Sequence, residues 1–463
     1  MFEDEAEYLM RKASEAGVQY AEVRFEDTTY ETLAYVNGRV SEMGQVRIKG
    51  AGVRVFINGS VGFAATSDAT KEGLLNALKE AISIAKALGS GRQALSKEET
   101  RSGTFEIRGI KEHPREVEWD VKIELMRRAY EQAKGENTVS ALSRYAAYYG
   151  VIDFFNIEGS KIHVEPLLIG LSAFSVTKVN GGTGDGSETI GGSRGLELFK
   201  ERTPEEVGKR AYEKALEKAK AKYAPAGIHV VIITPRLAGV FAHESFGHLS
   251  EADNIVNGVS PLSGRLGEKI ASEEVTIVDS GIVPEGGYFM PVDDEGIPTQ
   301  KVVLVERGVL RGYLQSRETA AQLGTRSTGN ARAQDYRHEP IVRMRNTFFE
   351  RGNWKKEEII EETKNGILVE DPRGGQANLD GTFTFTASRG YIVEGGELKE
   401  PIRDVVLAGN ILEMLKFIDA VSHELELFTS PFGGCGKWGQ RAFVGLGGST
   451  LRVKKLMVGG RRG

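Results

Sequence analysis

"GTFTFTASRGYIVEGGEL", residues 381–398, alternates apolar and polar side chains and reaches the turn-forming pair Gly395–Gly396 near its end. Alternation over this length is typical of a β-strand with one buried face. Comparable short apolar runs between glycine-rich turns lie at 275–281, 300–314, 366–371 and 441–460. The chain from about residue 225 onward is therefore predicted to be β-rich, a sandwich or an open barrel, with isolated helices at 235–252 and 406–418.

The N-terminal half has a different pattern, in which helices alternate with groups of strands. Amphipathic helices are predicted at 3–16, 70–88, 118–134 and 203–221. Thr70 is a suitable N-cap for the second of them. Asn-Gly turns at 36–39 and 57–60 predict β-hairpins. The segment 89–114 lacks periodicity and is interpreted as a connector.

These patterns predict an α+β fold. Residues 1–90 are expected to form an N-terminal α/β domain of helices and antiparallel strands. A linker and a middle α/β domain follow at 91–224, and a β-rich C-terminal domain that carries the metal site spans 225–463.

The composition narrows the classes of protein. Of 463 residues, 40% are hydrophobic and 27% are charged, as in ordinary globular proteins. A net charge of −5 disfavours nucleic acid as a main partner, and the basic segment 451–463 is interpreted as a solvated tail. No apolar run approaches the roughly 20 residues of a membrane span, and the acidic start has no secretory pattern. The single cysteine, Cys435, cannot form a disulfide within the chain, and a cytoplasmic location is predicted.

The segment "FAHESFGHLSEAD", residues 241–253, holds two histidines with a glutamate beside the first. In an α-helix, positions i and i+5 lie about 140° apart, so His243 and His248 would diverge. A single π-type turn absorbs one residue and brings both onto one face, and Gly247 is a residue type that tolerates such a distortion. The alternative is a regular helix with one buried and one exposed histidine.

The segment "SPFGGCGKWGQ", residues 430–440, places Cys435 among three glycines. Such a loop lets the backbone approach another element closely, and zinc accepts two histidines and a thiolate with a fourth position left for water. Glu244 would then act as general base and afterwards as general acid. The alternative is that Cys435 is a small buried apolar residue.

Two acidic residues follow the histidines. Glu251 and Asp253 offer a carboxylate as an alternative third ligand, but we expect them either to orient an imidazole from behind or to be simple surface charges. The glycine-rich segment 181–195 lacks the order of a phosphate-binding loop and is expected to be a flexible loop beside a substrate cleft. Four arginines are expected to clamp the carbonyls or carboxylate of a bound peptide: Arg332, Arg337, Arg343 and Arg345.

Four motifs together resemble the TldD branch of the TldD/PmbA family, and the likeness extends over essentially the whole chain. They are HESFGHLSEAD (243–253), VDDEGIPTQKVVLVERGVLRGYLQSRETA (292–320), YRHEPIVRMRNTFFERG (336–352) and FTSPFGGCGKWGQ (428–440). The resemblance implies a zinc metalloprotease whose Zn2+ ligands map onto His243, His248 and Cys435, with Glu244 as the catalytic glutamate. Because all four are present, the chain resembles the catalytic TldD-type subunit.

The resemblance also implies a substrate class and partners. The family acts on peptides and small or unfolded proteins in an enclosed cavity, and the TldD subunit works with a TldE (PmbA) relative that lacks the metal motif. The expected partner is therefore a TldE-like subunit or, where none exists, a second copy of the chain, with no nucleic acid and no membrane. A non-enzymatic peptide-binding or regulatory protein with a structural zinc site is the alternative.

Overall fold

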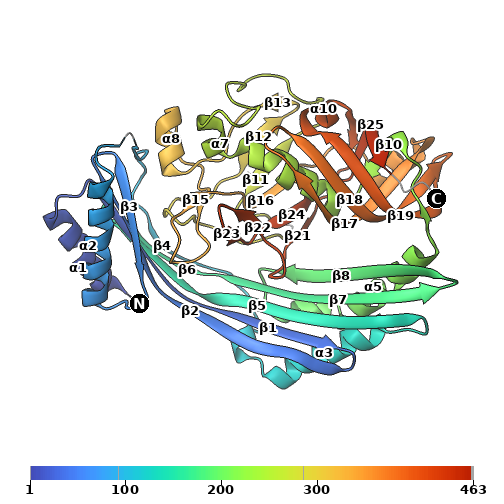
Figure 1. Cartoon of the computed structure of the whole chain (residues 1–463), viewed down its shortest axis with the longest axis horizontal. Helices are drawn as coiled ribbons and strands as arrows, with labels where there is room; N and C mark the ends of the chain where they lie inside the picture. Colours follow the sequence, from blue (N-terminus) through green and yellow to red (C-terminus); the bar gives the residue numbers. More distant parts are fainter. Residues whose placement is uncertain (1, 92, 285, 460–463) are drawn as a thin grey trace.

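The computed structural model describes residues 2–91, 93–284 and 286–459. Figure 1 shows two parts: a curved sheet with helices on its outer face, and a β-rich C-terminal half that lies against its inner face. This arrangement confirms the predicted α+β class. The strands on both sides of residue 90 belong to one sheet, and the domain boundaries stay a prediction.

The N-terminal sheet has the order β3-β2-β1-β5-β6-β4, and β7 and β8 extend it from β5. Its strands are β1 (Tyr20–Val36), β2 (Arg39–Ile57), β3 (Ser60–Thr66), β4 (Ser102–Glu106), β5 (Thr138–Asn156), β6 (Lys161–Glu165), β7 (Leu167–Val179) and β8 (Gly182–Gly192). The helical segments of this half are α1 (Glu3–Glu15), α2 (Lys71–Ala87), η1 (Pro114–Glu116), α3 (Trp119–Ala133), α4 (Leu198–Glu201) and α5 (Pro204–Lys220).

Local signals in this half formed as predicted. Asn37 and Gly38 close the β1–β2 hairpin with φ of 50° and 84°, and Asn58 repeats the geometry between β2 and β3. Positive φ at both central residues matches the right-handed twist of the paired strands. Thr70 caps α2 by accepting a hydrogen bond from the Gly73 amide.

Strand β1 separates two environments by simple alternation. Val23 and Phe25 pack into the core beneath α1 and α2. Arg24, Glu26 and Thr28 point to the opposite face, where Arg24 donates to the Asp335 carbonyl of the C-terminal half. Because a strand has a period of two, one segment can bury apolar groups against helices and present polar groups to the other half.

The prediction of a flexible loop at 181–195 is wrong, because most of it forms strand β8. A Cβ atom at Gly184 would lie 2.2 Å from the Ala215 carbonyl oxygen of α5, and one at Gly186 would lie 2.3 Å from that of Ala211. The glycines therefore let α5 pack directly on the strand, a tertiary requirement that the local pattern does not reveal.

The C-terminal half contains a seven-stranded and a six-stranded sheet. The first has the order β20-β25-β10-β17-β18-β19-β9, and a further pairing of β25 with β19 closes five strands into a barrel. Its strands are β9 (Lys222–Tyr223), β10 (Gly227–Ile233), β17 (Asn365–Ala377), β18 (Thr382–Glu394), β19 (Glu397–Asn410), β20 (Ile418–Val421) and β25 (Leu451–Gly459). The second, in the order β13-β12-β11-β16-β24-β21, consists of β11 (Ile277–Ser280), β12 (Val302–Glu306), β13 (Val309–Leu310), β16 (Asn346–Phe349), β21 (Glu426–Phe428) and β24 (Gly445–Gly448).

Short elements complete this half. Two hairpins are formed by β14 (Ala331–Arg332) with β15 (Ile341–Val342), and by β22 (Cys435–Lys437) with β23 (Gln440–Ala442). The helical segments are α6 (Pro235–Val240), η2 (Phe241–Gly247), η3 (His248–Ser250), α7 (Ala252–Val256), α8 (Arg317–Leu323), α9 (Lys356–Glu361) and α10 (Ile411–Lys416).

Two predictions for this half need correction. The helix predicted at 406–418 is confined to 411–416, because residues up to Asn410 continue strand β19. The basic segment 451–463 is not a free tail, since 451–459 form β25 between β10 and β20, and 460–463 lie outside the described residues. No helix in the described ranges is long and apolar enough to cross a membrane.

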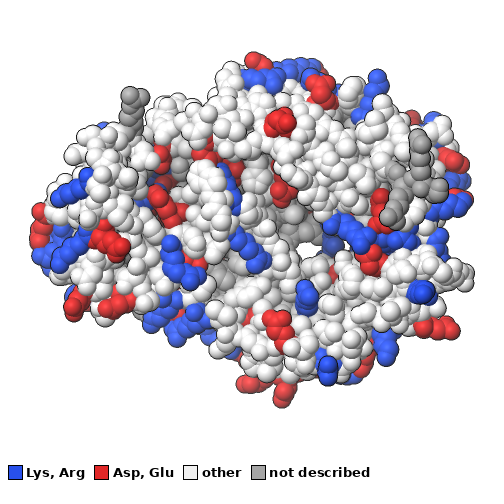
Figure 2. All heavy atoms as spheres, in the orientation of Figure 1, with Lys and Arg blue, Asp and Glu red and all other residues white. Residues whose placement is uncertain are grey.

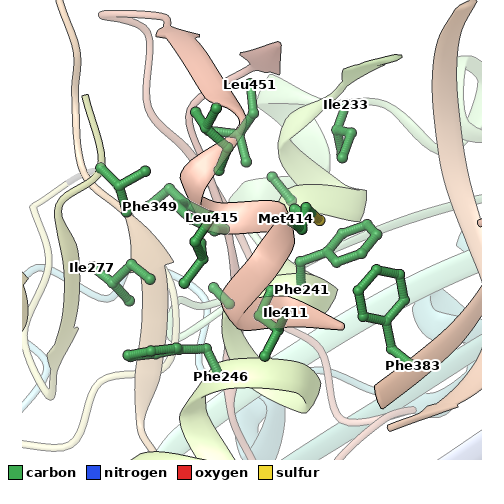
Figure 3. Close-up of a cluster of buried hydrophobic side chains, with 14 of the residues drawn as sticks. Ile233, Phe241, Phe246, Ile277, Phe349, Phe383, Ile411, Met414, Leu415 and Leu451 are labelled. Carbon is green, nitrogen blue, oxygen red and sulfur yellow. The ribbon is translucent and has the colours of Figure 1, made fainter. Parts of the chain in front are cut away.

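The core of the C-terminal half surrounds the helical segment that carries the two histidines. Figure 3 shows Phe241 of η2 beside Phe383 of β18. The ring centroids are 5.0 Å apart and the planes nearly perpendicular, and Phe385 makes a similar edge contact at 5.1 Å. These contacts fix the position of η2 against the barrel.

Candidate metal centre

The histidines lie on a helix that changes its winding. Thr234 occupies the N-cap position, although its hydroxyl donates to the Val369 carbonyl rather than capping, and Pro235 starts α6. Residues Phe241–Gly247 form a π-helix, so the predicted π-type turn is confirmed. The rings of His243 and His248 are 5.5 Å apart between centroids, at an interplanar angle of 82°.

Gly247 has a different role from the one predicted. Its φ of −58° is ordinary for any residue in a helix. A Cβ atom there would lie 2.0 Å from the Met344 sulfur, which is fully buried. The glycine therefore makes room for Met344 beneath the π-turn, and its backbone freedom is not used.

Cys435 reaches the histidines on the β22–β23 hairpin. Its Sγ lies 3.2 Å from Nε2 of His248. Gly433, Gly434 and Gly436 do not have positive φ. The turn is made instead by Trp438 and Gly439, with φ of 50° and 77°.

The three side chains form a compact donor set. One ligand atom from each of His243, His248 and Cys435 lies within 4.8 Å of the other two. Both ring nitrogens of His243 are buried without a hydrogen-bond partner. Because an unpaired buried imidazole is costly, this orphaned group fits a site that binds a metal ion.

Glu244 lies beside both imidazoles. Its carboxylate oxygens are 3.9 Å from Nε2 of His243 and 3.8 Å from Nε2 of His248. The Glu244 side chain remains 42% exposed, whereas His243 is fully buried. A carboxylate in this position can reach both a molecule bound at the centre and the surrounding water.

The two acidic residues after His248 lie away from the donor atoms. Glu251 accepts a hydrogen bond of 2.8 Å at His248 Nδ1, the ring nitrogen opposite the one near Cys435. Lys437 lies 3.0 Å from the same Glu251 oxygen and 2.6 Å from Asp253. Glu251 thus contacts the ring nitrogen that faces away from Cys435, and Asp253 is tied to Lys437.

Lys437 lies at the centre but was not predicted from the sequence to do so. It lies two residues after Cys435 on the same strand, and residues i and i+2 of a strand project from one face. That spacing could have indicated that Lys437 accompanies the thiol. Nothing in the sequence indicates its carboxylate partners.

Electrostatic interactions favour charged groups at the cluster. Burial alone would raise the pKa of Cys435, but the imidazoles of His243 and His248 lower it to about 5. Burial opposes protonation of His248, yet the Glu251 carboxylate and Cys435 raise its pKa well above the ordinary value. The pKa of buried Glu251 falls to about 2 because His248 and Lys437 outweigh desolvation. Without metal, Cys435 and His248 therefore form a thiolate–imidazolium pair.

The prediction that four arginines clamp a peptide is wrong for two of them. Arg345 is fully buried on Asp279, with Nε 2.7 Å from a carboxylate oxygen. Arg343 donates to the Cys435 and Gln440 carbonyls and so supports the hairpin. Arg332 and Arg337 instead line a cavity between the two halves.

Comparisons with known proteins cover nearly the entire chain. Residues 21–85, 112–219 and 226–460 match the families described as PmbA/TldA metallopeptidase domain 1, central domain and C-terminal domain. A metalloprotease of Methanothermobacter thermautotrophicus is 37% identical over 448 residues, with 96% of each chain covered. A zinc metalloprotease TldD homolog of Saccharolobus solfataricus is 31% identical and covers 97% of this chain and 99% of its own.

Solved structures share the fold. A protein of Thermotoga maritima described as a candidate modulator of a DNA gyrase superposes with a TM-score of 0.82 at 24% identity, with 99% of this chain and 100% of that chain covered. TldE from Thermococcus kodakarensis superposes with a TM-score of 0.79 at 22% identity, with 98% and 99% covered.

Proposed function

Because the chain belongs to the PmbA/TldD metallopeptidase family, we propose that it is a zinc-dependent peptidase of the HExxxH type that hydrolyses peptides or small unfolded proteins. His243, His248 and Cys435 are the proposed zinc ligands, and Glu244 is the proposed general base and acid. The observation that carries the proposal is the convergence of these three donors within 4.8 Å, with Glu244 beside both rings.

The number of donors favours catalysis over a structural role. Structural zinc sites are closed by four protein ligands, whereas catalytic sites keep one position open. The donor group found among the described residues has three members. Glu251, the acid on the far ring nitrogen of His248, is occupied by His248 and Lys437.

Each residue of the centre has a separate task. A bound zinc ion would polarise the scissile carbonyl and make a water molecule more acidic. The Glu244 carboxylate accepts a proton from water and passes it to the nitrogen of the leaving amine, as its partly exposed position allows. Glu251 holds His248 in the tautomer that leaves Nε2 free for the metal.

Substrate, partner and location follow from the family and remain proposals. We expect peptides to be cleaved inside a cavity closed by a TldE/PmbA-like subunit or by a second copy of the chain, in the cytoplasm. The fold likeness to TldE of Thermococcus kodakarensis supports such an assembly, since a related subunit has the same shape. Purification through a tag on this chain after co-expression with a TldE-like protein, followed by mass spectrometry of the subunits, distinguishes the two forms.

The deciding experiment compares wild type with Glu244→Gln. Zinc content is measured by mass spectrometry, and cleavage of an unfolded casein is followed in parallel. We expect equal zinc in both proteins and a loss of cleavage of at least about 100-fold in the variant. Cleavage by Glu244→Gln at the wild-type rate would refute the general-base role.

A Cys435→Ala variant separates the enzyme from the structural alternative. We expect it to lose zinc and activity together while it stays folded. Stoichiometric zinc in this variant would remove Cys435 from the ligand set. Zinc binding by wild type without cleavage of any peptide would favour a regulatory protein.

A further inference from the structure

A cavity of about 290 Å³ lies between the N-terminal sheet and the C-terminal half, outside the donor cluster. Figure 2 shows the surface hollowed between the two halves. Most of the wall is apolar, with Ile152, Phe154 and Val164 from the sheet and Met290 and Phe443 from the other half. The volume is about twice that of a roughly 150 Å³ cavity that takes up benzene. One large side chain therefore fits with part of its backbone.

The cavity adjoins the candidate metal centre through one pair of residues. Ala442 lines the cavity and is the cross-strand partner of Cys435 in the β22–β23 hairpin. Opposed Cα atoms in antiparallel strands lie about 4.5–5.5 Å apart. Gln334, also in the wall, is tied to the hairpin by hydrogen bonds with the Gln440 side chain and the Arg441 amide.

Arg332 presents unused donors in the cavity. It is 5% exposed, and the one hydrogen bond that its guanidinium makes in the described part of the chain runs from Nη1 to the Met344 carbonyl, at 2.6 Å. Its guanidinium lies over the Tyr288 ring, 5.4 Å from the centroid. A guanidinium carries five N–H groups, so several remain for a ligand oxygen.

The other charged groups of the wall already have partners. Asp335 accepts a hydrogen bond from the Arg337 guanidinium, and Asp294 accepts one from the Ala333 amide. Glu26 accepts from the Tyr336 amide and the Thr28 hydroxyl. A basic substrate side chain would therefore find these carboxylates already hydrogen-bonded, which makes its burial in the cavity unfavourable.

We infer that this cavity is a specificity subsite of the peptidase, which takes a large apolar or aromatic side chain next to the scissile amide while Arg332 donates to that residue's main-chain carbonyl. The inference rests on the proposed function. Its substrate class is peptides with a bulky apolar residue beside the cleaved bond. Peptides with only small or basic residues are poor substrates.

The test fills the cavity with a larger side chain placed on strands of the N-terminal sheet, which contribute no residue to the metal centre. Ile152 of β5 lines the cavity opposite Glu26, whereas Val151 faces the other side of the sheet opposite Asp27. Ile152→Trp is the test variant and Val151→Trp the matched control. Val164→Trp on β6 fills the cavity from a different wall, should Ile152→Trp fold poorly.

The zinc-loaded full chain is assayed with quenched Ala-Gly peptides that carry one Phe, Leu, Asp, Lys or additional Ala. Wild type and Val151→Trp are expected to cut beside Phe or Leu at least about tenfold faster than the Ala peptide. Ile152→Trp and Val164→Trp should lose this preference, so that they cut the Phe and Leu peptides no faster than the Ala peptide. An equal preference in all four proteins overturns the inference and leaves the peptidase function intact.

A binding measurement reports on the cavity without catalysis. N-acetyl-phenylalaninamide is titrated into metal-free protein and followed by saturation-transfer NMR. Binding by wild type and Val151→Trp but not by Ile152→Trp or Val164→Trp supports the subsite, even if no peptide is cleaved and the proposed function fails. Equal binding by all four proteins, or none by wild type, overturns it.

Discussion

The helical segment 235–250 and the hairpin 435–442 meet at the candidate metal centre but are held by different forces. The helical segment is fixed by apolar packing: Phe241, Phe246 and Leu249 are buried in the core. The hairpin consists of two three-residue strands, and Trp438 at its tip is 67% exposed.

Polar contacts hold the hairpin in place. Arg343, itself buried, donates to the carbonyls of Cys435 and Gln440. Lys437 pairs with Glu251 and Asp253. Packing thus positions the imidazoles and charge positions the thiolate. We expect changes in the helix to reduce stability and changes in the hairpin to reduce metal affinity.

Phe241→Ala is expected to have the largest effect. The side chain has no exposed surface and packs edge-on against both Phe383 and Phe385, so its removal leaves a cavity at the barrel wall. The free energy of unfolding should fall by about 3–5 kcal/mol, measured by urea denaturation without metal. The metal affinity of the protein that remains folded should change less than tenfold. A loss smaller than about 1 kcal/mol would contradict the assigned role of packing.

Cys435→Ser tests the hairpin side of the candidate metal centre. If the thiolate is a ligand, zinc affinity should fall by more than the roughly 10–100-fold that partners behind a ligand contribute. A competition titration with a chelating dye gives the affinity. Urea unfolding with EDTA measures separately how much the metal-free thiolate–imidazolium pair contributes to stability, because the substitution nearly preserves shape but removes the thiolate beside His248. Unchanged zinc affinity would show that the hairpin is not part of the centre.

The helical side was largely predictable from sequence, because its determinants are local. Five-residue spacing of His243 and His248 requires a π-turn if both are to face one point, and the structure has it. The same reasoning gave the wrong reason for Gly247, which serves the distant Met344. The prediction of a flexible loop at the glycines of β8 was wrong for the same reason, since these glycines make room for α5. A glycine in the sequence indicates an unusual backbone conformation only where no neighbouring element needs the space that a side chain would occupy.

The hairpin side was less predictable, because its contacts span the chain. Cys435 stood out as the only cysteine, but Lys437 is recognisable only once Glu251 and Asp253 lie beside it. Arg343 and Arg345 were predicted to clamp a bound peptide, but both side chains are buried in the interior. The cavity joins strands of the first sheet to segments after residue 287, so no local pattern indicated it.

Lys437→Met is expected to have an intermediate effect. It removes the cation that accompanies the buried Glu251, which in turn holds Nδ1 of His248. Zinc affinity should fall by about 10–100-fold, and Lys437→Arg should recover part of it. Lys222→Met, which breaks an exposed pair with Glu400, is the matched control and should leave affinity unchanged. Equal effects of Lys437→Met and Lys222→Met would show that charge does not hold the hairpin side.

The number of protons released when zinc binds is the smallest expected difference between the helical segment and the hairpin. In the metal-free protein the pKa of Cys435 is about 5, whereas that of His248 is raised well above its ordinary value. Between about pH 6 and 7 the thiol is therefore already ionised and His248 still holds a proton, which a metal must displace. Because the free protein binds that proton and the metal complex does not, affinity should rise about tenfold per pH unit in this window. Calorimetry in buffers of different ionisation enthalpy should give at least one proton released per zinc, the one held by His248, and Glu251→Gln should reduce the number by lowering the pKa of His248. Zinc binding without proton release would mean that His248 is neutral before binding, and that charge does not hold the hairpin against the helix.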